Sequence, residues 1–107
     1  MNTVISTTKA PAAVGPYNQA IKAGNTVYCS GQIGLDPATG TMVEGVIAQA
    51  NRAFDNLEAV LTQAGAKMTD VVKFTIFLTD INDFAQVNEV MASHVPTPYP
   101  ARSCMQV

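Results

Sequence analysis

Arg102 is the residue of this sequence whose type and position most directly suggest a chemical role. It is one of two arginines, the other being Arg52, and it closely follows Pro98 and Pro100. Proline fixes its own φ angle and favours extended backbone in the residue before it, so we expect a rigid, extended approach to a strand that begins near Arg102. A guanidinium held in this way can bind a carboxylate through two parallel hydrogen bonds. The alternative is a surface arginine in an ordinary ion pair.

Tyr17 and Asn88 are two further polar candidates. Tyr17 follows Gly15 and Pro16 in a turn-rich stretch, and its phenol can donate or accept a hydrogen bond. The alternative for Tyr17 is a half-buried packing residue whose hydroxyl reaches water. Asn88 lies among apolar residues of a predicted helix, where it can act as a cap or make a local hydrogen bond.

The two cysteines are not predicted to be nucleophiles. A thiol nucleophile needs a base, and no base lies near Cys104 in the sequence, where the only histidine is His94. We expect Cys104 to be a small buried packing residue and Cys29 to lie in the core. Their spacing matches no metal-binding motif, so we predict no metal site. Two free thiols fit a reducing compartment such as the cytoplasm.

The composition excludes several classes of protein. Six basic and eight acidic residues give a net charge of -2, and the scattered basic residues leave no footprint for nucleic acid. No apolar run approaches the roughly 20 residues needed to span a membrane, and we expect no signal peptide. The 107 residues suffice for one domain with a modest core. Because only 13% of them are charged, we expect apolar surface to meet another subunit.

The first half of the chain predicts two strands and a long helix. Residues 20–23 and 26–32 are strand candidates, and residues 36–40 form a turn between two short extended pieces. Apolar residues recur every three or four positions over residues 45–64, which predicts a helix that ends at Gly65. Its opposite, polar side is expected to carry Gln49, Arg52, Asn56, Glu58 and Gln63.

The second half predicts strand, helix and strand. Residues 71–78 are rich in β-branched and aromatic side chains, as strands are. A turn at 80–83 starts a helix that runs towards Val95 and is ended by the prolines after it, and residues 101–107 form a last strand. This order indicates an α+β fold, a mixed sheet with two helices on one face. The apolar face of the strand over 71–78 consists of Val72, Phe74, Ile76 and Leu78.

Five short motifs, in order along the chain, give it a resemblance to a known family. They are Gly15-Pro16-Tyr17, Ser30-Gly31-Gln32-Ile33, the helix with Gln49, Asn56 and Leu57, Val87-Asn88, and Pro100-Ala101-Arg102-Ser103. From about Ala10 to Val107 the sequence resembles the RidA (YjgF) family of reactive-intermediate deaminases. The resemblance implies a chorismate-mutase-like α+β fold, with residues 1–107 as a single domain of a homotrimer whose sites lie between subunits. Family members normally continue beyond the position of Val107 with a closing strand and a glutamate thought to position water, so the resemblance implies a domain shortened at its C-terminus.

The same resemblance implies a function. Family members hydrolyse imines and enamines, such as 2-aminoacrylate and 2-iminobutanoate, to 2-keto acids and ammonia without a metal or organic cofactor. It implies that Arg102 holds the carboxylate and Tyr17 acts near the attacking water or the nitrogen. The implied substrate-binding residues are Ser30, Gly31, Asn88 and Cys104. One alternative is a non-catalytic trimeric module that binds small carboxylates as a sensor or regulator. RNA cleavage, proposed for some relatives, finds little support in the acidic charge balance.

Overall fold

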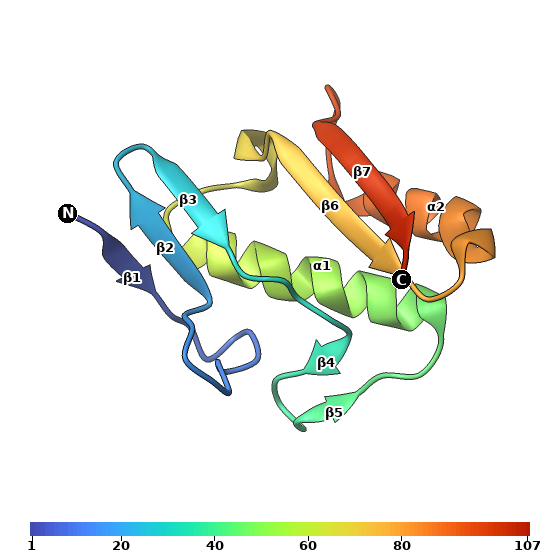
Figure 1. The fold of residues 1–107 in the computed structure, drawn as a ribbon, viewed down its shortest axis with the longest axis horizontal. Coiled ribbons are helices and arrows are strands. Elements are labelled where there is room, and N and C mark those ends of the chain that lie inside the picture. The colour runs from blue at the N-terminus through green and yellow to red at the C-terminus, as the bar shows by residue number, and fades with distance from the viewer.

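A computed structural model describes all residues from 1 to 107 and has two helices and seven strands (Figure 1). The α+β class predicted from the sequence is confirmed, because strands and helices alternate in the expected order. Two short 3₁₀ turns, Met68–Asp70 and Ile81–Asp83, precede β6 and α2 respectively. The elements are β1 (Thr3–Ile5), β2 (Ala20–Ala23), β3 (Thr26–Cys29), β4 (Leu35–Asp36), β5 (Thr41–Met42), α1 (Val46–Gln63), β6 (Lys73–Leu78), α2 (Phe84–His94) and β7 (Ala101–Gln106).

The strands form two main groups that share the helix layer. Strands β1, β2 and β3 make an antiparallel sheet, and β6 and β7 make a parallel pair in which Phe74 lies opposite Arg102. Strands β4 and β5 form a separate hairpin. Both helices lie behind the strands in Figure 1, with α1 crossing under both groups. One edge of β3 and one edge of β6 remain unpaired.

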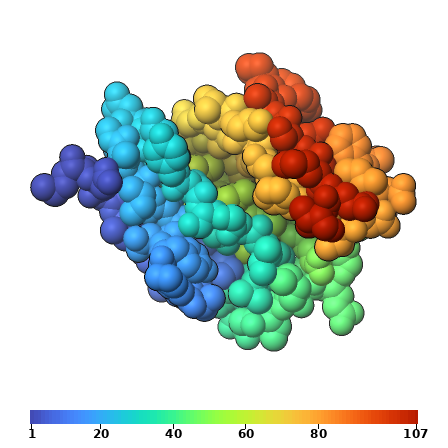
Figure 2. Space-filling model, in the orientation of Figure 1, coloured from blue at the N-terminus to red at the C-terminus, as the bar shows by residue number.

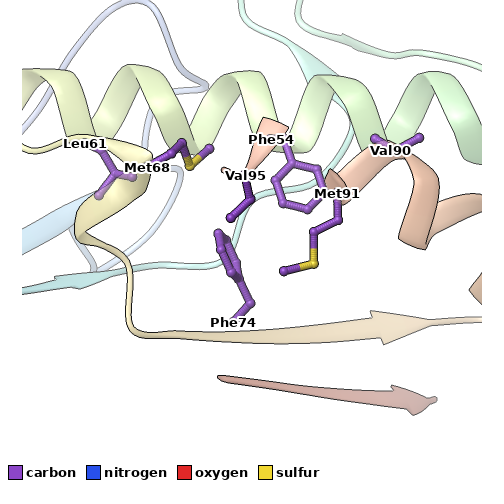
Figure 3. Packing of buried hydrophobic residues seen from close by; sticks show 7 residues of the cluster. All are labelled: Phe54, Leu61, Met68, Phe74, Val90, Met91 and Val95. Carbon is purple, nitrogen blue, oxygen red and sulfur yellow. The ribbon is translucent and has the colours of Figure 1, made fainter. Parts of the chain in front are cut away.

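Helix α1 supplies the core of both groups. Its residue Phe54 packs edge-to-face against Phe74 of β6, with ring centroids 5.7 Å apart (Figure 3). On the other side of the helix, Val60 packs with Ile5 and Ala20 beneath the three-stranded sheet. Burial of apolar surface on both sides therefore fixes the two strand groups relative to each other through α1. The first cluster consists of Phe54, Leu61, Met68, Phe74, Val90, Met91 and Val95.

The strand boundaries differ from the sequence prediction at three places. Strand β1 was not predicted, because three residues are too few to display a clear alternation. Strand β3 ends at Cys29, since the backbone beyond it bonds to a loop and a helix side chain. Strand β6 begins at Lys73, which leaves Val72 exposed and outside the apolar face assigned to it. The predicted end of the helix at Gly65 is confirmed by its φ of 81°, a left-handed conformation.

Two burial predictions were wrong. Asn56 was assigned to the polar side of the helix, but its side chain is fully buried. Hydrogen bonds to two backbone carbonyls offset the cost of that burial. Cys29 was assigned to the core, but the residue is exposed. The reason is its position at the end of β3, whose outer edge has no neighbouring strand.

Candidate functional site

Arg102 lies against one stripe of helix α2. Its Nη1 atom donates a hydrogen bond to Oδ1 of Asn88 and approaches the sulfur of Met91 at 3.8 Å. Its guanidinium carbon lies 4.9 Å from the ring centroid of Phe84, a cation–π distance. Residues 84, 88 and 91 share one face of a helix because they are four and three positions apart. Three side chains of one helix face therefore contact the guanidinium, while Arg102 stays exposed to solvent.

Arg102 has no acidic partner. The only such contact of the structure joins Nδ1 of His94 to Oδ1 of Asp55 at 3.8 Å, and it is an ion pair only when His94 is protonated. The structure thus lacks the surface ion pair that was the alternative for Arg102. Five N–H donors are available on a guanidinium, and the contacts with Asn88 and Met91 use only those of Nη1. The remaining donors can bind an incoming anion, and a planar carboxylate matches their geometry.

Cys104 lies two residues beyond Arg102 on β7, so both side chains project from the same face of the strand. The residue is half-buried, opposite Ile76 of β6. The other face of β7 points away from the helices, where Lys73 donates a hydrogen bond to Ser103 at 2.9 Å. Cys104 thus lies beside Arg102 on the face of β7 that is turned towards the helices.

Neither thiol has an activating base. The ring of His94 stacks on Phe54 and its Nε2 atom lies 2.8 Å from Oδ1 of Asn51, so it is engaged between the two helices. Desolvation raises the pKa of the Cys29 thiol, which lowers its thiolate content and its reactivity. The residue as a whole is exposed, but neighbouring atoms partly desolvate its thiol group. These surroundings favour structural thiols rather than catalytic ones.

Tyr17, Ser30 and Gly31 form a second group around the loop that precedes β2. The Tyr17 hydroxyl accepts a long hydrogen bond of 3.4 Å from the backbone of Val14. The Ser30 hydroxyl donates to the carbonyl of Asn18 at 2.6 Å. Ser30 therefore ties the end of β3 to the loop that carries Tyr17. Gly31 is exposed, and a Cβ atom added there would meet nothing within 4 Å, which leaves its backbone open to a ligand.

The two groups do not meet within one chain. The first group, with Arg102, Asn88 and Cys104, lies on β7 and α2, whereas the second lies at β3 and the loop before β2. Strand β6 lies between β3 and β7 in Figure 1, and no hydrogen bond joins the groups. Sequence reasoning missed Phe84 as a neighbour of Arg102 because its helical spacing indicated only packing. The signal available was the spacing of Phe84 to Asn88, four residues apart on one helix face.

Fold and site together define a class of protein. It is a small α+β protein in which an arginine on β7 lies against helix α2 and has no acidic partner. A family model described as Endoribonuclease L-PSP matches residues 7–107. A relative from Capra hircus, named 2-iminobutanoate/2-iminopropanoate deaminase, is 49% identical over 105 residues. That match covers 97% of this chain and 77% of the relative.

Solved structures agree with the family match. RidA from the Antarctic bacterium Psychrobacter sp. PAMC 21119 superimposes with a TM-score of 0.96 at 53% identity, covering 98% of this chain and 85% of that one. Escherichia coli TdcF with bound serine superimposes with a TM-score of 0.91 at 42% identity, again covering 98% and 85%. The chain therefore belongs to the RidA/YjgF family, as the sequence motifs indicated.

Proposed function

We propose that this protein hydrolyses 2-imino acids and their enamine tautomers to 2-keto acids and ammonia. The observation that carries the proposal is Arg102, a guanidinium without an acidic partner that Asn88 and Phe84 hold in place. Relatives about half identical to this chain are named 2-iminobutanoate/2-iminopropanoate deaminases. A small substrate whose one permanent charge is a carboxylate fits such a site.

The reaction needs a held substrate and a directed water. The water oxygen adds to the imine carbon and one water proton passes to the nitrogen, which gives a carbinolamine. The hydroxyl proton then moves to the nitrogen, the C–N bond breaks, and a keto acid and ammonia result. In our proposal Arg102 holds the carboxylate and Tyr17 exchanges a hydrogen bond with the water or the nitrogen. Asn88 keeps the guanidinium oriented, while Ser30, Gly31 and Cys104 line the pocket. Positioning and a fixed electrostatic environment supply the rate gain, because an imine is already electrophilic.

We further propose a homotrimer in which the two residue groups meet across a subunit interface. The support is that neither group is complete alone and that the sheet face away from the helices exposes several large apolar side chains. On that face Tyr28, Phe77 and Met105 are 66%, 61% and 44% exposed, and Phe77 lies beside Met105 in the strand register. Exposed apolar patches of this kind mark association surfaces. Sedimentation tests it: the wild type should behave as a trimer, and Phe77→Asp as a smaller species.

We propose that residues 1–107 form one domain whose sheet takes a further strand between β3 and β6. Both strands have an unpaired edge, and the space-filling view has a furrow between them in which part of α1 is visible (Figure 2). A strand there would satisfy both edges and join the two groups into one mixed sheet. Amides of β3 and β6 should exchange more slowly in a chain extended to the length of the goat relative. Unchanged exchange would count against this strand.

The charge pattern favours a small-molecule substrate over RNA, despite the description of the family model. Acidic residues outnumber basic ones by eight to six, whereas nucleic-acid binding needs clustered positive charge. Neither helix is long and apolar enough to cross a membrane. We propose a cytoplasmic location, which the two free thiols support.

Turnover separates a deaminase from a protein that only binds carboxylates. An amino-acid oxidase can generate 2-iminobutanoate in situ, and ammonia release is then followed with and without the protein. We expect release well above the spontaneous rate. Binding of 2-ketobutyrate by calorimetry without faster ammonia release would favour the non-catalytic sensor instead.

A further inference from the structure

Asn56 is a fully buried carboxamide in the middle of α1. Its Nδ2 atom donates to the carbonyls of Ile33 and Leu35, at 3.1 and 2.9 Å. Its Oδ1 atom accepts a hydrogen bond of 3.1 Å from Nε of Arg52. Only the nitrogen of an amide can donate to two carbonyls, so these contacts fix the orientation of the group. Asn56 therefore anchors the backbone between β3 and β4 directly to the helix.

The same backbone lies in direct contact with α1 at Gly34. A Cβ atom at this position would lie 2.6 Å from the Cα atom of Gln49, so only glycine permits the approach. The carbonyl of Gly34 also accepts a hydrogen bond of 2.9 Å from the backbone of Val43. The segment from Ile33 to Leu35 is consequently held by α1 and by the backbone of Val43.

The other end of this segment is anchored by Ser30. Its backbone N–H donates to the carbonyl of Gln19 at 2.9 Å and its hydroxyl to that of Asn18 at 2.6 Å. Gln19 is itself buried, and its side chain bonds to the backbone of the preceding loop. Gly31 thus lies between two fixed points, although no contact of its own restrains it on its open side.

We propose that Asn56 is a positioning residue for catalysis: by anchoring Ile33 and Leu35, it fixes the backbone of Gly31 where the substrate approaches. The inference rests on the proposed function, which takes Gly31 as part of the pocket. Asn56 touches no substrate and acts only through the chain segment. Arg102, oriented by Asn88, holds the carboxylate from other elements, so loosening this segment should lower kcat and change KM little.

Asn56→Leu tests the proposal, because it keeps a side chain of similar size but leaves both carbonyls without a donor. Leu61→Ala is the control: it removes buried contacts from the same helix without touching the segment. At a temperature where both variants are folded, we expect kcat of Asn56→Leu to fall about tenfold to a hundredfold, as small misplacements of reacting groups do. We expect kcat of Leu61→Ala to stay near that of the wild type despite a lower Tm.

Amide NMR gives a readout that needs no turnover. Asn56→Leu should shift the Gly31 and Gln32 resonances and speed their hydrogen exchange, while Leu61→Ala should not. If Asn56→Leu does not fold, Gly34→Ala displaces the same segment at its contact with Gln49 and should have the same effects. Wild-type kcat, or unchanged Gly31 and Gln32 amides, in the folded variant would overturn the proposal. A wild type without turnover would refute the proposed function and leave the amide result to decide this one.

Discussion

Replacing Arg102 by lysine separates its geometry from its charge. The guanidinium is planar, lies over the ring of Phe84 and donates to Asn88 with one arm. The hydrogen bonds of Arg102 use Nη1 alone, which leaves Nη2 and Nε without a partner. A lysine ammonium keeps the positive charge but is a mobile point charge that cannot form two parallel hydrogen bonds to one carboxylate.

The size of the effect follows from the bonds that are lost. Losing one charge-assisted hydrogen bond of a bidentate pair costs roughly 1.5–3 kcal/mol, which is about a tenfold to hundredfold decrease in kcat/KM. Arg102→Ala should cost more, because the substrate carboxylate then has no cation. Stability should change little for both variants, since Arg102 is exposed and forms no ion pair.

The assay is steady-state ammonia release from 2-iminobutanoate, with the thermal midpoint measured on the same samples. Lys22→Ala is a matched control, because it removes a positive charge from an exposed side chain of β2. It should retain wild-type kcat/KM, which would exclude a general effect of net charge. Wild-type turnover by Arg102→Lys would refute the bidentate contact and with it the role assigned to Arg102.

Three further predictions follow from contacts in the structure. Asn88→Asp places a carboxylate against Arg102; the internal ion pair should lower kcat/KM by up to about fivefold at an unchanged thermal midpoint, and undiminished activity would contradict it. Cys29, whose thiol pKa is raised by desolvation, should react with iodoacetamide at pH 7 more slowly than a free cysteine peptide and gain rate only at higher pH; equal rates would refute the desolvation. Phe74→Ala removes the ring that packs on Phe54 and should destabilise by about 3–5 kcal/mol in urea unfolding; a loss below about 1 kcal/mol would contradict the packing.

The helices and most strands could be predicted because their signals are local. The apolar spacing over 45–64 and Gly65 at its end locate α1 to within one residue at either end. The β-branched run from Val71 to Leu78 likewise locates β6, two residues too early. Strand β1 escaped prediction because its pairing with β2 depends on contacts distant in sequence.

The partners of the buried amides could not be predicted from the sequence. Asn56 bonds to carbonyls 23 and 21 residues away, and no periodic pattern encodes such a contact. The burial of Gln19 could not be predicted either, because its side chain bonds to backbone carbonyls of the preceding loop. A helical wheel treats a polar residue as exposed, whereas the fold can bury it wherever backbone carbonyls lack donors.

Arg102 could be singled out by its prolines, but its neighbours came only from the structure. The parallel pairing of β7 with β6 turns the side chain towards α2, where Phe84 and Asn88 lie one turn apart. Parallel pairing of two strands joined by a helix is a topological property that the last strand alone does not display.

A crystal structure with 2-ketobutyrate, the keto acid that 2-iminobutanoate would yield, tests the central claim most directly. The account predicts both carboxylate oxygens within hydrogen-bond distance of the Arg102 guanidinium, with C2 facing Gly31 and Tyr17 across a subunit interface. A keto acid bound elsewhere, or an Arg102 that still contacts only Asn88, Met91 and Phe84 at saturating ligand, would contradict it.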